Sequence, residues 1–295
     1  MLILPKPTKD EFALGFIGRL CHVNLVSSYF DMMRSLLAHY GLISEAGAYL
    51  KALALLSEKD LQDFVAAHSI APAMLTNWNV FAGRLGGKVH RKIGDERNPL
   101  KLARKQAYLC PKCIEQQRHD LGFSFWHRVH QLPGIYWCPW HQTTLLGCDG
   151  LLMQRALPSV EAALPEREPA PAEDFGNRIL HNFSEVMMSF LAYSGRHAKS
   201  GFSAHLRSRA VELGLSVDKQ TSAGRHLSDL ASETCPAWWL DNVFGWRGKE
   251  MGRYFQPIDG ALSAGLVGAR AFALAIALLF APDEWQGLGI KTRSN

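Results

Sequence analysis

The chain has 295 residues, of which 47% are hydrophobic and 20% are charged, and this composition excludes an intrinsically disordered protein. The net charge of +5 permits nucleic-acid binding but does not indicate it, and six cysteines are too few for a disulfide scaffold of this length. The N-terminus lacks the pattern of a signal peptide, and the most apolar window, residues 271–282, is too short to span a bilayer. We therefore expect a cytoplasmic protein with reduced thiols and no membrane partner.

A first pair of helices is predicted over residues 10–24 and 27–41, because apolar side chains recur there at helical spacing. Ser27 or Ser28 can cap the second of these helices, and Gly41 can end it. The pair has the order of a helix-turn-helix, which binds DNA in some proteins and serves only to pack helices in others.

A second pair of helices is predicted over residues 57–70 and 71–81. Ser57 and Asp60 have nearly the spacing of a capping box, and Pro72 suits a first turn. Direct DNA reading by either pair is an open alternative to simple packing.

Residues 84–105 concentrate basic charge. Eight Lys or Arg residues stand there against two acidic ones, a net charge of +6 that exceeds that of the whole chain. A basic loop interrupted by glycines is suited to contacting phosphates, although a solvated surface would have the same composition. The candidate nucleic-acid contacts are Arg84, Lys88, Arg91, Lys92, Lys101, Arg104 and Lys105.

Two C-P-x-[CH] corners follow at residues 110–141. Cys110 and Cys113 form the first, and after 24 residues Cys138 and His141 form the second. Together they supply the Cys3His ligand set of a tetrahedral Zn²⁺ site, and no ligand position is left open for catalysis. We therefore predict one structural zinc ion. A redox pair formed by the first two cysteines is the main alternative.

The other residues around the corners are assigned to packing. A helix is expected over residues 123–131, with His127 and His130 one turn apart and not ligating the metal, and strand-like alternation is seen only near residues 133–147. We expect Trp126, Trp137 and Trp140 to form a small core. Cys148 is a weak substitute ligand, and Cys21 and Cys235 are predicted to be core thiols.

A segment rich in Pro and Glu, residues 153–174, divides the chain into two predicted domains. Its prolines are expected to break any helix, so it is interpreted as a linker or an extended arm. Residues 1–152 would form a mainly α domain with helix-turn-helix-like pairs and an embedded zinc module. Residues 175–295 would form a small all-α domain, with a packed loop at 235–259 and a final apolar helix near 262–281.

The sequence resembles the TniQ/TnsD family of bacterial transposition proteins over roughly residues 3–147. The resemblance rests on "LPKPTKDEFALGFIGRLCHVN" and, more specifically, on the zinc region with its "FWHRVHQLPGIYWCPWH" segment. It implies that the zinc ligands are Cys110, Cys113, Cys138 and His141. Longer members have further zinc knuckles, whereas the C-terminal half of this chain has only Cys235.

The resemblance implies a non-catalytic target-selection adaptor that links target DNA, or a CRISPR RNA-guided complex, to an AAA+ transposition ATPase. No P-loop, dinucleotide fingerprint or nucleophile elbow is found in the sequence, in agreement with a protein that is not an enzyme. Two other functions stay open: a zinc-containing, sequence-specific DNA-binding regulator, and a protein-bridging adaptor without DNA contact. A second copy of the chain is a further candidate partner of the C-terminal domain.

Overall fold

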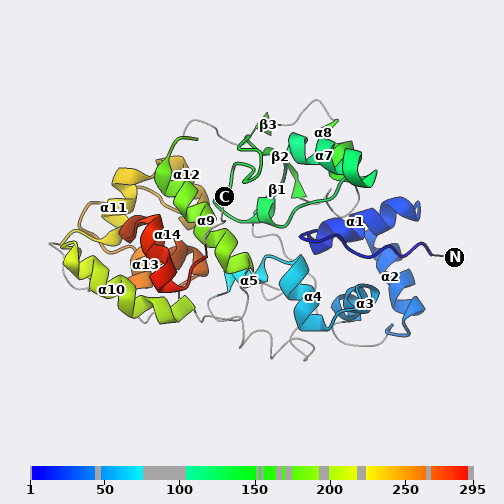
Figure 1. The fold of residues 1–295 in the computed structure, drawn as a ribbon, viewed down its shortest axis with the longest axis horizontal. Helices are drawn as coiled ribbons and strands as arrows, with labels where there is room; N and C mark the ends of the chain where they lie inside the picture. Colours follow the sequence, from blue (N-terminus) through cyan, green and yellow to red (C-terminus); the bar gives the residue numbers. More distant parts are fainter. Residues whose placement is uncertain are drawn as a thin grey trace. The chain divides into compact units, whose positions relative to one another are not determined.

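Two compact units make up the chain, residues 1–71 with 82–173, and residues 72–81 with 174–295. The computed structural model describes residues 2–43, 48–75, 104–150, 153, 156–163, 168–169, 175–192, 199–217, 224–263 and 267–291. The fold is mainly helical, as predicted, with one small sheet among the described residues (Figure 1). No described helix is long and apolar enough to cross a membrane. The predicted domain limits at 152 and 174 stay a prediction.

The N-terminal helices of the first unit follow the apolar patterns of the sequence. Ser28 caps α2, since its Oγ accepts from the backbone N–H of Asp31 at 3.3 Å, and Asp60 caps α4 in the same way. Ser57 does not join a capping box, because its hydroxyl donates to the carbonyl of Leu53 at the end of a helix that the sequence did not indicate. The helices here are α1 (Ala13–Val23), α2 (Tyr29–His39), α3 (Ala48–Leu56) and α4 (Leu61–His68), followed by α5 (Ala71–Met74) at the boundary between the units.

A buried ion pair joins the N-terminal segment to α1. Arg19 donates from Nε and Nη2 to the two carboxylate oxygens of Glu11, at 2.9 and 2.7 Å, and from Nη2 to the carbonyl of Lys6. Glu11 also accepts from the backbone N–H of Thr8. The guanidinium lies 4.7 Å from the ring centroid of Phe123. The Glu11–Arg19 pair therefore fixes the segment before α1 against that helix.

A three-stranded antiparallel sheet lies beside the cysteine-rich segment. Its central strand, β2 (Leu146–Asp149), pairs with β1 (Gln106–Leu109), with Leu109 opposite Leu146, and with the short β3 (Glu168–Pro169). The strand-like pattern near 133–147 forms only an isolated bridge between Trp137 and Thr144 before β2 begins. The sequence pattern does not predict β1, because three of its four residues are buried and its side chains therefore do not alternate between buried and exposed.

The helix predicted over residues 123–131 is wrong: His127 forms an isolated antiparallel bridge with Glu11, and a single 3-10 turn, Val129–Gln131, follows. Backbone hydrogen bonds to the N-terminal segment prevent residues 123–128 from forming a helix. Phe12 donates to the carbonyl of Trp126 at 2.7 Å, and Arg128 donates to the carbonyl of Asp10 at 3.1 Å. The helix between the two corners is α7 (Pro111–Leu121), which ends at Gly122 in the left-handed conformation.

The described part of the predicted linker contains structure. Pro158 begins the short helix α8 (Pro158–Ala162), so the expectation that the prolines exclude a helix is wrong at this point. Proline is compatible with a first turn, because the N–H that it lacks would have no partner inside the helix. The N–H of Ser159 donates to Oγ of Ser124, and the indole of Trp126 donates to the carbonyl of Ala156, which fixes α8 within the first unit.

The described residues of the second unit form helices joined by loops, with no strand among them. The apolar helix α14 (Ala269–Leu279) packs against α9 (Arg178–Ala192), whose apolar stripe is buried as predicted (Figure 1). The segment at 235–259, predicted as a packed loop, includes two short helices. The remaining helices are α10 (Ser203–Glu212), α11 (Leu227–Thr234), α12 (Ala237–Phe244) and α13 (Gln256–Asp259), with 3-10 turns at Lys199–Phe202, Gly260–Leu262 and Pro282–Leu288.

Candidate metal centre

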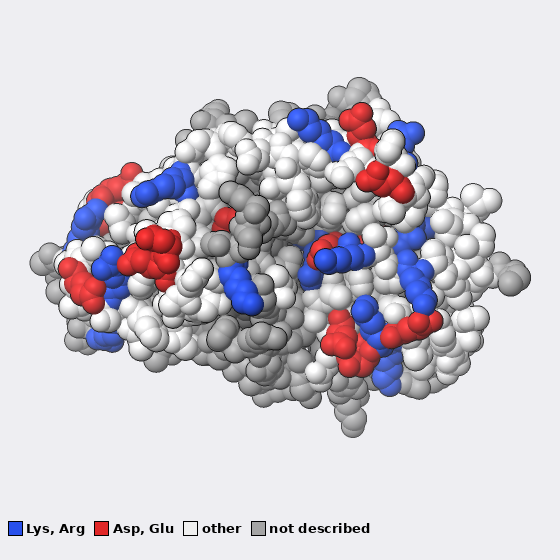
Figure 2. All heavy atoms as spheres, in the orientation of Figure 1, with Lys and Arg blue, Asp and Glu red and all other residues white. Residues whose placement is uncertain are grey.

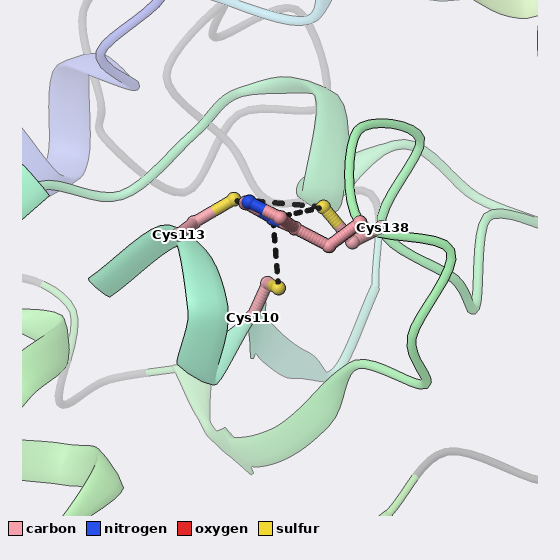
Figure 3. A group of neighbouring side chains, drawn as sticks. Cys110, Cys113 and Cys138 are labelled. Carbon is pink, nitrogen blue, oxygen red and sulfur yellow. Dashed lines mark hydrogen bonds between the residues drawn. The ribbon is translucent and has the colours of Figure 1, made fainter. Parts of the chain in front are cut away.

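Four predicted ligands converge at one point of the first unit. Cys110 follows β1 and is the N-cap of α7, and Cys113 lies in the first turn of that helix. Cys138 and His141 lie in a tight turn, in which the N–H of Gln142 donates to the carbonyl of Cys138 and the N–H of Cys138 donates to the carbonyl of Thr143, both at 2.8 Å. Figure 3 shows the three cysteine side chains pointing toward one another.

The spacing of the donor atoms matches a tetrahedral metal. Nδ1 of His141 lies 3.6, 3.3 and 3.5 Å from Sγ of Cys110, Cys113 and Cys138, and all the donor atoms lie within 4.8 Å of one another. Zinc–ligand bonds of about 2.3 Å to sulfur and about 2.0 Å to nitrogen require edges of about 3.5–3.8 Å. Four of the six donor–donor distances, at 3.3–3.6 Å, are close to these edges, so the four residues can hold one ion.

The three sulfurs are packed too closely to be thiolates without a cation. The Sγ atoms of Cys113 and Cys138 are 3.5 Å apart. Hydrogen bonds from Cys113 and then Cys138 lower the pKa of Cys110, while the hydrogen bond to Cys110 raises the pKa of Cys113. One thiolate is thus stabilised by neighbours that keep their protons. A bound dication would stabilise the deprotonated form of all three.

All three cysteines are buried, and four protein donors complete a tetrahedral shell. Such a closed set is typical of a structural site, whereas catalytic zinc keeps one position for water or substrate. Oγ1 of Thr143 lies 3.4 Å from Sγ of Cys110 and supplies an outer contact of the kind that orients metal ligands.

His127 and His130 lie beside the centre in the non-ligating positions predicted for them. Burial lowers the pKa of His127 to about 4 and the pKa of His130 well below its usual value, so both rings are neutral at physiological pH. They contact Trp140, with ring centroids 4.6 and 5.6 Å from it. Trp126 and Trp137 are buried as predicted, but Trp140 is 43% exposed, so its assignment to the core is wrong.

Two buried glutamines position the segment between the corners, a role that no local pattern in the sequence predicts. Gln131 forms hydrogen bonds to both backbone groups of Tyr108 and so takes the place of a strand beside β1. Gln117 accepts from the backbone N–H of Phe125, and its amide nitrogen lies 2.6 Å from Nε2 of His127. Gln131 begins the Gln-Leu-Pro element of the "FWHRVHQLPGIYWCPWH" segment, so the family resemblance is the one feature of the sequence that draws attention to this residue.

Arg104 has a structural role that differs from the predicted nucleic-acid contact. Its guanidinium lies 3.4 Å from the ring centroid of Tyr108 and 4.4 Å from that of Tyr136, and it donates to the carbonyl of Ile135 at 2.7 Å. Since these contacts engage its charged group inside the first unit, we correct the prediction for this residue. Lys105, the next residue, is exposed. The other candidates, Arg84, Lys88, Arg91, Lys92 and Lys101, lie outside the described residues.

The remaining cysteines are buried thiols. Cys148 donates to the carbonyl of Ala107 across the sheet and does not join the metal ligands. Cys21 and Cys235 are buried, as predicted.

On the face drawn in Figure 2, the described basic and acidic side chains are interspersed and form no broad area of one sign.

Comparison with known proteins identifies one family. Residues 2–145 match the sequence model of the TniQ family, a range that contains both the buried Glu11–Arg19 pair and the complete metal centre. A search of curated proteins found no match to this chain.

Proposed function

Because the chain belongs to the TniQ family, we propose that it is a non-catalytic adaptor that links a target to an AAA+ transposition ATPase. The family comprises target-selection proteins of transposition, which act with DNA and other transposition proteins. The target in our proposal is DNA or a CRISPR RNA-guided complex bound to DNA. The observation that supports the proposal best is the closed Cys3His centre inside the family domain, because it supplies a rigid platform and no open coordination position.

The proposed ion is one structural Zn²⁺, held by Cys110, Cys113, Cys138 and His141. Three soft sulfur donors and one imidazole nitrogen at tetrahedral spacing select zinc over the harder Mg²⁺ and Ca²⁺. Zinc would supply folding free energy here by joining the start of α7 to the turn after Trp137, since ligand pairs from distant segments meet only in the folded state.

Replacing one ligand tests the zinc assignment. We expect Cys113→Ser to release the metal and to unfold part of the first unit. The matched control is Cys148→Ser, which changes an equally buried thiol outside the ligand set and should retain the metal. Metal content by mass spectrometry and helicity by circular dichroism measure both effects. A fully folded wild-type chain that purifies without metal would contradict the assignment.

The proposed DNA contacts lie in the 84–105 stretch and are Arg84, Lys88, Arg91, Lys92, Lys101 and Lys105. Reversing Lys88, Arg91 and Lys92 to Glu should abolish a salt-sensitive and weakly sequence-dependent affinity for duplex DNA, measured by fluorescence anisotropy over a range of salt concentrations. The control reverses three exposed arginines of the second unit, Arg207, Arg247 and Arg253. Unchanged binding by the first variant would remove the stretch from the proposal.

Reconstitution distinguishes the adaptor from its two alternatives. The adaptor should retain an AAA+ transposition ATPase only when target DNA or the guide complex is also present. A defined footprint on one operator by the chain alone would favour a sequence-specific regulator. Binding to the ATPase or the guide complex without any DNA affinity would favour a purely protein-bridging adaptor.

A further inference from the structure

A pocket of about 360 Å³ opens beside the metal centre, within the first unit. One wall is a face of α7 that carries Cys113, Gln117 and Asp120, and the opposite wall includes Trp140 and His141 from the second corner. Its volume is near the lower end of the range of about 300–1,000 Å³ that is usual for ligand sites. It is therefore large enough for a single long side chain of a partner.

The walls of this pocket are aromatic and fixed in place. Phe125, His127 and Trp140 all line the pocket. The centroid of the His127 ring lies 4.6 Å from the centroid of the Phe125 ring and 4.6 Å from that of the Trp140 ring. Gln117 holds the backbone of Phe125 and contacts the ring of His127. Trp140 stands between two metal ligands in the sequence, so the corner at Cys138–His141 sets its position. Walls that are fixed before binding reduce the entropy cost of binding.

The charge of the pocket is negative. Asp120 is exposed on the rim, with its Oδ1 2.8 Å from Nδ1 of His119, and is the one carboxylate among the lining residues. The metal centre adds to this, because a dication held by three thiolates and a neutral imidazole carries a net charge of about −1. A carboxylate beside aromatic faces attracts a cation through ion pairing and cation–π contact. The same charge repels the phosphates of nucleic acid.

We propose that this pocket binds an arginine side chain from a basic segment of a partner protein. The planar guanidinium would stack on Trp140 and donate to Asp120, a geometry that suits arginine better than the compact ammonium of lysine. This proposal rests on the metal assigned above but not on DNA binding or on the ATPase. It assigns the face of the first unit beside α7 to protein contact and leaves nucleic acid to other surfaces.

A small-molecule titration tests the proposal on the full-length, zinc-loaded chain. Nα-acetyl-L-arginine amide is the probe, and the indole N–H signal of Trp140 in a ¹H–¹⁵N spectrum of the tryptophan-labelled chain is the readout. We expect saturable shifts of this signal in the millimolar range. The neutral isostere, Nα-acetyl-L-citrulline amide, should bind at least roughly five-fold more weakly, because it keeps the shape of arginine and loses its charge.

Variants of α7 separate charge from fold. Asp120→Asn should weaken arginine-amide binding by roughly five-fold. The control Glu115→Gln makes the same change of charge on the same helix, at an exposed position outside the pocket lining, and should bind normally. Zinc content, measured on both variants, should be unchanged.

Three results would overturn the proposal. They are equal binding of the citrulline amide, unchanged binding by Asp120→Asn, and a thymidine oligonucleotide shifting the Trp140 signal when the arginine amide does not. The last would reassign the pocket to nucleic acid. A chain that still joins target and ATPase in the reconstitution while failing this titration would refute the pocket proposal alone.

Discussion

The substitution Glu11→Gln tests whether the buried ion pair holds the N-terminal segment on α1. The side chains of Glu11 and Arg19 are 0% and 5% exposed, and two charge-assisted hydrogen bonds join them. Glutamine keeps the shape of glutamate but leaves the guanidinium of Arg19 buried without a counter-charge. Removing one partner of a buried pair costs about 3–5 kcal/mol, and we expect about 3 kcal/mol because the glutamine oxygen still accepts one bond.

Hydrogen exchange of α1, followed by mass spectrometry of the full-length chain, localises this effect to the first unit. A loss of about 3 kcal/mol should raise the opening constant of the α1 amides by roughly a hundred-fold. The control Asp31→Asn breaks the pair between Asp31 and Arg34, whose side chains are 59% and 77% exposed, and should change exchange by less than about five-fold. Equal exchange in the two variants would refute the reasoning that the Glu11–Arg19 pair stabilises α1 more than an exposed pair because it is buried.

Two further predictions concern the packing of the first unit. Burial lowers the pKa of His68 to about 4 from 6.5, so the stability that its neutral ring contributes is complete above about pH 6.5 and is lost as the pH falls to about 4. The urea midpoint of His68→Asn should therefore fall less between pH 7 and pH 4.5 than that of the exposed control His39→Asn; equal falls would contradict this. A Cβ on Gly15 would lie 2.6 Å from Cδ1 of Trp126, so Gly15→Ala should lower the free energy of unfolding in urea by about 1–3 kcal/mol. The control Gly176→Ala adds a methyl group in open space and should lower it far less.

The sequence predicted those features whose information is local. Each metal corner spans four residues, so the spacing of Cys110 to Cys113 and of Cys138 to His141 was sufficient to indicate the ligand set before the structure brought the two corners together. The apolar stripes of α1, α2 and α9 and the cap at Ser28 are also local, because helix formation depends on neighbours within about four residues.

Only the tertiary structure decided features that depend on partners far away in the chain. Residues 124–127 have a helical pattern but form no helix, because the backbone of this segment pairs with residues 10–12. Arg104 resembles its basic neighbours in sequence, yet two tyrosine rings and a carbonyl engage its guanidinium. The exposed Trp140 was assigned to the core on composition alone. For the first two features, the pairing with residues 10–12 and the contacts of Arg104 with Tyr136 and Ile135 join segments roughly thirty to more than a hundred residues apart. For Trp140 the deciding feature is exposure to solvent, which a local pattern does not contain.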